Sequence, residues 1–115
     1  MKIAHEDNLE AVIFNSPDAK GASMKALISP KEGWEGYVMR VLELTPGGYS
    51  PKHSHPWPHI NYMLDGNGTL FINGEEHDVK AGSYAYIPAN TLHQFKNAGE
   101  GVFKFICIVP EEGHK

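Results

Sequence analysis

The sequence predicts a protein built almost entirely of β-strands. Short apolar stretches alternate with Gly, Pro and Asn throughout the 115 residues, and none has the three-to-four-residue periodicity of a long amphipathic helix. Asn73-Gly74 separates two such stretches, and this dipeptide indicates a hairpin because a type I′ turn needs positive φ at both central positions. We expect strands at residues 10–14, 25–29, 37–44, 60–65, 69–72, 75–79, 83–87, 91–96 and 101–109.

The patterns of these strands indicate how they are used. The first two lie in a weakly patterned N-terminal region, which we expect to contain an edge strand or an arm exchanged with a partner. In the strand at 37–44, Arg40 interrupts a face that is otherwise apolar. Asn73-Gly74 joins the strands at 69–72 and 75–79. In the last strand, alternate residues from Phe103 to Val109 share one apolar face, so Lys104 should face outward.

Length and charge limit the possible functions. A chain of 115 residues with no linker-like change in composition predicts a single domain over residues 1–115. The net charge is −4 and Lys and Arg are dispersed, so no nucleic-acid partner is expected. The single cysteine, Cys107, excludes an intramolecular disulfide. Without a leader or a long apolar run, we expect a cytoplasmic protein with no membrane contact.

Four of the seven histidines follow a pattern that suits a metal site. They occur in the two blocks Gly47-x5-His53-x-His55-x3-His59-x6-Gly66 and Gly82-x5-Pro88-x-Asn90-x2-His93-x3-Asn97. Residues two apart in a strand share a face, so the first two imidazoles can reach one ion from a single strand. The prolines on either side of Trp57 predict a bend that brings in the third, with the indole folded over the site. The alternatives are surface histidines, a pH-sensitive patch or a fortuitous nickel binder. The remaining histidines, including His77 and His114, are interpreted as solvated surface residues.

These blocks resemble the two motifs of the cupin superfamily, G-x5-H-x-H-x3,4-E-x6-G and G-x5-P-x-G-x2-H-x3-N. The segment from His53 to His59 is similar to that of small single-domain bacterial cupins, of the cupin 2 conserved barrel type, with a four-histidine metal site. The resemblance implies a double-stranded β-helix, or jelly-roll barrel, with motif 1 at 47–66, motif 2 at 82–97 and the metal inside its wider mouth. Asn90 replaces a motif glycine, and Asn also tolerates the left-handed conformation.

His59 is the larger departure, because cupins usually have a glutamate ligand at that position. The resemblance implies His53, His55, His59 and His93 as the metal ligands. The alternatives are a carboxylate supplied by Glu75 or Asp65, or a site with only three ligands.

Four imidazole ligands would give the site a distinctive charge. A glutamate cancels one unit of a metal's charge, whereas neutral imidazoles leave the full dication, which attracts anions and acts as a stronger Lewis acid. Imidazole ligation suits Zn, Cu, Fe, Ni and, less tightly, Mn, so we expect one divalent transition metal per chain of undetermined identity. Metal affinity should fall below the ordinary His pKa of about 6.5, because only a neutral imidazole binds metal.

Several other side chains are candidates for the walls of a substrate pocket. Arg40 either anchors an anionic substrate, forms an internal salt bridge or places a charge at the rim of the barrel. Strand parity together with the resemblance turns Phe105 and Cys107 toward the metal, although a free cysteine such as Cys107 is more often an inert core thiol. Phe95 should also face inward. The substrate-pocket candidates are therefore Arg40, Trp57, Phe95, Phe105 and Cys107.

The first functional hypothesis is a metal-dependent, dioxygenase-like oxidoreductase, an oxygenase acting on a small, anionic organic substrate. Its general acid or base is not visible, since no unassigned carboxylate falls in either motif. One alternative is a cupin that binds a metal or small molecule without turnover, as a sensor. Another is an isomerase of a sugar or keto acid whose carbonyl the metal polarises. By analogy with other small cupins, we expect a homodimer.

Overall fold

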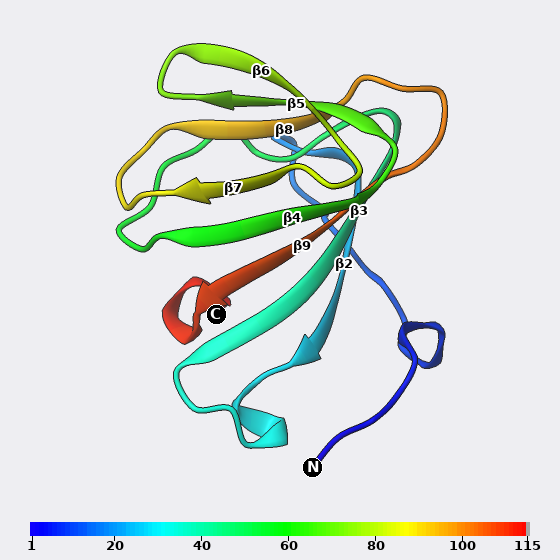
Figure 1. The fold of residues 1–115 in the computed structure, drawn as a ribbon, viewed down its shortest axis with the longest axis vertical. Helices are drawn as coiled ribbons and strands as arrows, with labels where there is room; N and C mark the ends of the chain where they lie inside the picture. Colours follow the sequence, from blue (N-terminus) through cyan, green and yellow to red (C-terminus); the bar gives the residue numbers. More distant parts are fainter. Residues whose placement is uncertain (115) are drawn as a thin grey trace.

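The structure, a computed structural model, describes residues 1–114 and consists mainly of antiparallel strands (Figure 1). The strands are β1 (Val12–Ile13), β2 (Lys20–Ile28), β3 (Tyr37–Tyr49), β4 (His59–Asp65), β5 (Asn67–Ile72), β6 (Glu75–Lys80), β7 (Tyr84–Ile87), β8 (His93–Asn97) and β9 (Phe103–Pro110). Three short 3-10 helices complete the fold: η1 (Glu6–Asn8), η2 (Pro30–Glu32) and η3 (Glu111–His114). Every strand expected from the sequence overlaps an observed one, and the predicted all-β class is confirmed.

The strands form one curled sheet in the order β6-β5-β8-β3-β9-β4-β7, with β2 also paired to β3 and β1 at the edge of β2. The sheet bends so that β5, β6 and β8 lie above the long β2, β3 and β9 in Figure 1, as in a jelly-roll barrel. The edge strand predicted in the N-terminal region is β1. No helix among residues 1–114 is long and apolar enough to cross a membrane.

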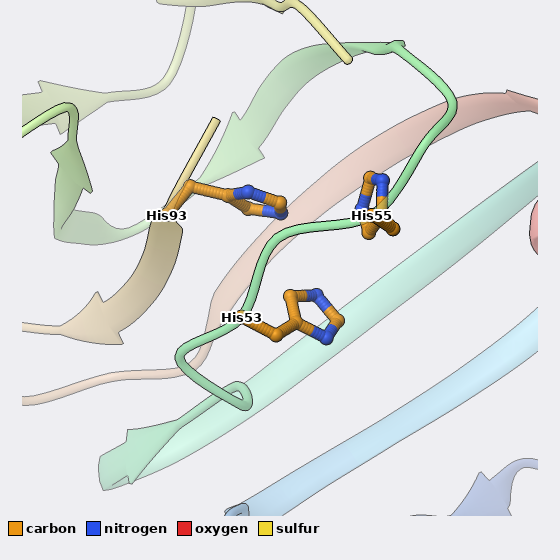
Figure 2. A group of neighbouring side chains, drawn as sticks. All are labelled: His53, His55 and His93. Atoms are coloured by element: carbon orange, nitrogen blue, oxygen red, sulfur yellow. The ribbon is translucent and has the colours of Figure 1, made fainter. Parts of the chain in front are cut away.

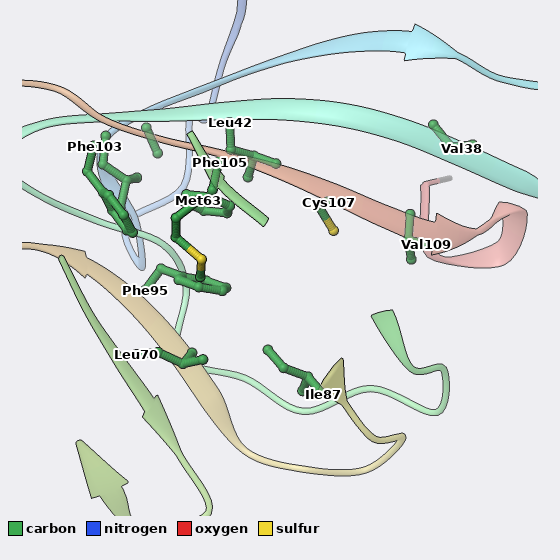
Figure 3. Packing of buried hydrophobic residues seen from close by; sticks show 12 residues of the cluster. Val38, Leu42, Met63, Leu70, Ile87, Phe95, Phe103, Phe105, Cys107 and Val109 are labelled. Carbon is green, nitrogen blue, oxygen red and sulfur yellow. The ribbon is translucent and has the colours of Figure 1, made fainter. Parts of the chain in front are cut away.

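The core lies between the two halves of the curled sheet, as the strand patterns predict. Figure 3 shows Phe103, Phe105 and Cys107 of β9 facing inward together with residues of the other strands. Along β9 the inward residues are at most 3% exposed. Lys104, between them, points outward, and its Nζ lies 2.8 Å from a carboxylate oxygen of Glu6. Alternation along β9 therefore separates core from surface as expected.

Two turns adopt the conformations that the sequence predicts. Asn73 and Gly74, between β5 and β6, have φ values of 51° and 86°, as a type I′ turn requires. Asn90, which stands where the motif has glycine, has φ of 61° and so adopts the left-handed conformation that a glycine would adopt. Gly66 ends the first motif with φ of 85°, and a Cβ built there would lie 2.3 Å from the Val102 carbonyl oxygen. Glycine is therefore required at that position by both conformation and space.

Some boundaries differ from the sequence prediction. β3 continues past Pro46 and Gly47 to Tyr49, because Tyr49 pairs with Lys20 of β2 and with Lys96 of β8. β2 begins earlier than predicted, because it follows β3 along this extension. The expected single strand carrying His53 and His55 is wrong: residues 50–58 form a loop, and only His53 makes an isolated bridge, to His93.

Candidate metal centre

His53 and His55 of the first motif are held by a loop that is fastened to the second motif. His53 and His93 exchange two backbone hydrogen bonds, of 3.1 and 3.0 Å. The backbone N–H of Asn90 donates to the carbonyl oxygen of His55 over 2.7 Å. Backbone contacts between the motifs, rather than strand parity, therefore bring the imidazoles together.

Three imidazoles form a compact group (Figure 2). His53 and His55 extend from the loop and His93 from the start of β8, with ring centroids 5.0 Å apart in each pair. One nitrogen from each ring lies within 4.8 Å of the other two. The three residues differ in burial: His53 is exposed, His55 is half-buried and His93 is buried. These three residues could hold a metal ion.

His59, the first residue of β4, lies against this group. Its side chain is buried, and its Nε2 is 3.1 Å from Nε2 of His93. Its ring centroid is 4.9 Å from that of His93 and 5.3 Å from that of His55. His59 therefore adjoins the three-histidine group on the His93 side, where it could serve as a fourth ligand.

Hydrogen bonds at the opposite ring nitrogens determine which nitrogens are free. Nδ1 of His55 is 2.7 Å from the carbonyl oxygen of Trp57, and Nδ1 of His93 is 2.8 Å from that of Thr91. Carbonyl oxygens only accept, so both Nδ1 atoms carry the proton and donate. When such a ring is neutral, its Nε2 therefore keeps the lone pair that binds a metal.

The same reasoning applies to His59 through Asn61. The amide nitrogen of Asn61 donates to the carbonyl oxygen of Ile106 over 3.2 Å, which orients the amide oxygen toward His59. Nδ1 of His59 lies 2.6 Å from that oxygen and must therefore donate to it. The Nε2 atoms of His59 and His93 thus face each other with two lone pairs, an arrangement that needs a cation between them. The donor set fits a divalent metal held by imidazoles, of which His55, His59 and His93 are oriented by a second hydrogen bond.

The electrostatic environment keeps these imidazoles neutral. Burial, followed by the nearby His93, lowers the pKa of His59 to about 3. Burial also lowers the pKa of His93. The pKa of His53 falls to about 4 for the same two leading reasons, although the exposure of this side chain lets solvent weaken the effect. These three rings are therefore unprotonated at pH 7 and competent to bind metal.

The imidazoles open into a cavity of about 280 Å³ between β3, β4, β8 and β9. The five pocket candidates from the sequence all line it: Arg40, Trp57, Phe95, Phe105 and Cys107. Trp57 stacks on His55, with centroids 4.9 Å apart and planes 10° from parallel, so the indole covers one side of the centre. Phe95 and Phe105 stack at 4.3 Å and form an apolar floor.

One of the alternatives for Arg40, the internal salt bridge, can be compared with the structure. Among residues 1–114, the salt bridges involve other cations, and the polar side-chain contact of Arg40 is an Nη2 donation to Cys107 Sγ over 3.2 Å. The internal salt bridge is therefore not found in the described part of the chain. Cys107 is buried and at the same time lines the cavity.

Asn61 and His114 are among the cavity-lining residues that were not recognised in the sequence. Asn61 follows His59 by two positions on β4, and this shared strand face was the signal that could have found it. His114 was interpreted as a surface residue, which is wrong: it lines the cavity and its Nδ1 is buried. The terminal η3 turn folds back beside Trp57, and no sequence pattern indicates this contact.

The carboxylates considered as alternative ligands lie elsewhere. Asp65, at the end of β4, accepts a hydrogen bond from the backbone N–H of Gly66 and is exposed. Glu75 begins β6 and approaches His77 on the exposed hairpin. No Asp or Glu among the described residues lines the cavity.

Comparison with known proteins identifies the family of the chain. The cupin domain profile matches residues 40–109, which is more than half of the chain. The chain therefore belongs to the cupin family.

Curated proteins match the chain only in part. An uncharacterized protein of Methanocaldococcus jannaschii is 38% identical over 48 residues, which cover 42% of this chain and 38% of that protein. The dimethylsulfoniopropionate lyase DddW of Ruegeria pomeroyi is 32% identical over 65 residues, which cover 56% of this chain and 43% of the lyase. The chain thus spans less than half the length of these relatives.

Solved structures match over nearly the whole chain. The polyketide cyclase RemF from Streptomyces resistomycificus superposes with a TM-score of 0.89 and 29% identity, covering 96% of this chain and 80% of the cyclase. A predicted oxalate decarboxylase from Thermotoga maritima superposes with a TM-score of 0.86 and 23% identity, covering 95% of this chain and 98% of the other chain. This match shows that the two proteins share a fold.

Proposed function

We propose that the chain is a metal-dependent enzyme that binds one divalent transition metal through His53, His55, His59 and His93 and acts on a small organic substrate. The main support is the convergence of three imidazoles, those of His55, His59 and His93, that each donate a hydrogen bond from Nδ1 and present Nε2 at the wall of a 280 Å³ cavity. A metal bound there would supply a Lewis acid that stabilises negative charge on a substrate oxygen. The aromatic floor of Phe95 and Phe105 would hold the apolar part of the substrate and exclude water.

For the reaction class, we propose an oxygen-independent lyase, cyclisation or isomerisation step. The names of two similar proteins support this: one is a lyase, and RemF, 29% identical over 96% of this chain, is a polyketide cyclase. A neutral ligand set favours such Lewis-acid chemistry, because no carboxylate ligand reduces the charge of the metal. The second candidate is the oxygenase expected from the sequence, supported by an all-imidazole donor set that suits Fe and Cu as well as Zn.

The metal proposal predicts one ion per chain in protein purified without added metal or a polyhistidine tag, measured by elemental analysis. His55→Ala and His59→Ala should each weaken metal binding by more than about tenfold. Removing a ligand has a larger effect than removing the hydrogen-bond partner that orients it. His77→Ala, on the exposed β6 hairpin, is the matched control and should bind normally. Normal metal content in a His55→Ala/His93→Ala double variant would contradict the proposal. Normal affinity in His59→Ala alone would leave a three-histidine centre.

The reaction classes are separated by oxygen. The metal-loaded protein would be incubated with β-keto acids and catechols under air and under nitrogen, with oxygen uptake and products followed together. Products formed equally under nitrogen, and lost in His55→Ala, are expected. Turnover only under air, with matching oxygen uptake, would instead establish the oxygenase.

A further inference from the structure

Two buried polar side-chain atoms lack a hydrogen-bond partner among residues 1–114, and both belong to residues that line the histidine cavity. They are Nε of Arg40, on β3, and Nδ1 of His114, in η3. Buried polar groups are normally satisfied, so two orphan atoms at one cavity point to a ligand that supplies acceptors.

Arg40 is the stronger of the two. Its guanidinium has sulfur of Cys107 as its side-chain partner, at 3.2 Å, and sulfur is a weak acceptor. Cys107 of β9 pairs with Arg40 of β3 on one side and with Asn61 of β4 on the other. Arg40 is therefore at the same position across the sheet as Asn61, the residue that orients His59. A guanidinium presents a planar set of donors that matches a carboxylate, and no carboxylate of the described chain lines the cavity.

His114 complements Arg40 as a neutral donor. Burial, and then the charge of Arg40, lower the pKa of His114, so the ring is neutral at pH 7 and has one N–H to give. η3 is held in place by close packing: a Cβ added to Gly113 would lie 2.4 Å from Nε1 of Trp57 and 2.4 Å from a methyl of Val109.

We propose that Arg40 and His114 bind the carboxylate of the substrate, so that the enzyme acts on a small organic acid with an apolar body. This deepens the proposed function and rests on it for the claim of turnover, but the carboxylate site itself is independent of the metal. The apolar body would lie on the floor formed by Phe95 and Phe105. This floor is two residues along the strands from Arg40, because Arg40 pairs with Cys107 and Leu42 pairs with Phe105. The other end of the acid would face the imidazoles.

The test uses benzoate and its neutral counterpart benzamide, titrated into metal-free and zinc-loaded protein by calorimetry. Benzoate should bind both forms at least tenfold more tightly than benzamide. Arg40→Met should reduce benzoate affinity at least tenfold, and His114→Phe several-fold, with metal content unchanged. Lys52→Met is the matched control: it removes an exposed positive charge that lies over the ring of Phe71, outside the cavity, and should bind benzoate normally.

The outcomes separate the two proposals. Equal benzoate binding by wild type and folded Arg40→Met, with metal bound in both, would overturn the carboxylate site alone. Arg40-dependent benzoate binding by a chain that binds no metal would overturn the metal proposal alone. If Arg40→Met does not fold, Arg40→Lys replaces it, because lysine keeps the charge but loses the planar donors and should still weaken benzoate binding. Equal affinity of the wild type for benzoate and benzamide would overturn the carboxylate site without any variant.

Discussion

Asn61 shows how one uncharged side chain sets the chemistry of a neighbouring imidazole. Its amide nitrogen is committed to the Ile106 carbonyl, so its oxygen must face His59 and accept the Nδ1 proton. The proton is thereby kept away from Nε2, the atom that faces His93 at 3.1 Å. Because the tautomer of His59 depends on this bond, Asn61 is a positioning residue for the metal centre.

Replacing Asn61 should therefore weaken metal binding without removing any ligand. Asn61→Leu removes the acceptor and should reduce zinc affinity by about 10–100-fold, the usual effect of losing such a partner. Asn61→Asp keeps an acceptor oxygen for the Nδ1 proton but loses the donation to Ile106, so it should retain more affinity than Asn61→Leu. Competition with a chromophoric chelator measures both affinities, and thermal unfolding checks the fold. Zinc affinity that is the same in both variants would show that Asn61 does not orient His59.

At the scale of elements, the strands could be predicted from the sequence but the route of the loop between β3 and β4 could not. Strand patterns are local, since alternation in β9 and the Asn73-Gly74 turn depend on adjacent residues. The convergence of His53 with His93 depends on a two-way backbone bridge between residues distant in sequence. Spacing therefore predicted which histidines meet, while only tertiary pairing shows how.

The terminal η3 turn illustrates the same limit. Its sequence, Glu111-Glu112-Gly113-His114, is polar and has no strand periodicity, so a solvated end was the natural expectation. The turn instead packs on Trp57 and Val109 because Gly113 leaves space for it. Packing against a side chain more than fifty residues away leaves no signal in local composition, and His114 was missed for that reason.

At the scale of the molecule, the outer face of β4 and β7 carries exposed aromatic and aliphatic side chains. Ile60 and Tyr62 of β4 pair with Tyr86 and Tyr84 of β7, and these four residues are 47–83% exposed. Such a face favours the expected homodimer. We predict a dimer by light scattering and a monomer for Tyr84→Lys/Tyr86→Lys, with Tyr37→Lys, exposed on β3, as the control. A monomeric wild type at micromolar concentration would contradict the prediction.

The neutral imidazoles also make stability depend on pH in a way the sequence alone does not predict. Their ordinary pKa of about 6.5 suggested that metal affinity would fall below that pH. Burial instead lowers the pKa of His59 to about 3, so protons compete with the metal at this ring only in more acidic solution. We therefore expect metal to be retained below pH 6.5. Keeping the ring neutral in this pH range lowers the free energy of unfolding of the protein.

The sign of that effect can be tested in the metal-free protein. Between pH 6.5 and the lowered pKa of His59, the unfolded chain binds a proton at this residue that the native chain does not, so the free energy of unfolding falls as pH falls; above pH 6.5 the ring contributes nothing. Urea unfolding in the presence of EDTA should show wild type losing up to about 1.4 kcal/mol per pH unit relative to His59→Gln between pH 6 and 4. His77→Gln, on the exposed hairpin, should follow the wild type. Parallel curves for wild type and His59→Gln would mean that His59 is protonated in the native state, and the two facing Nε2 atoms would then share that proton instead of a metal.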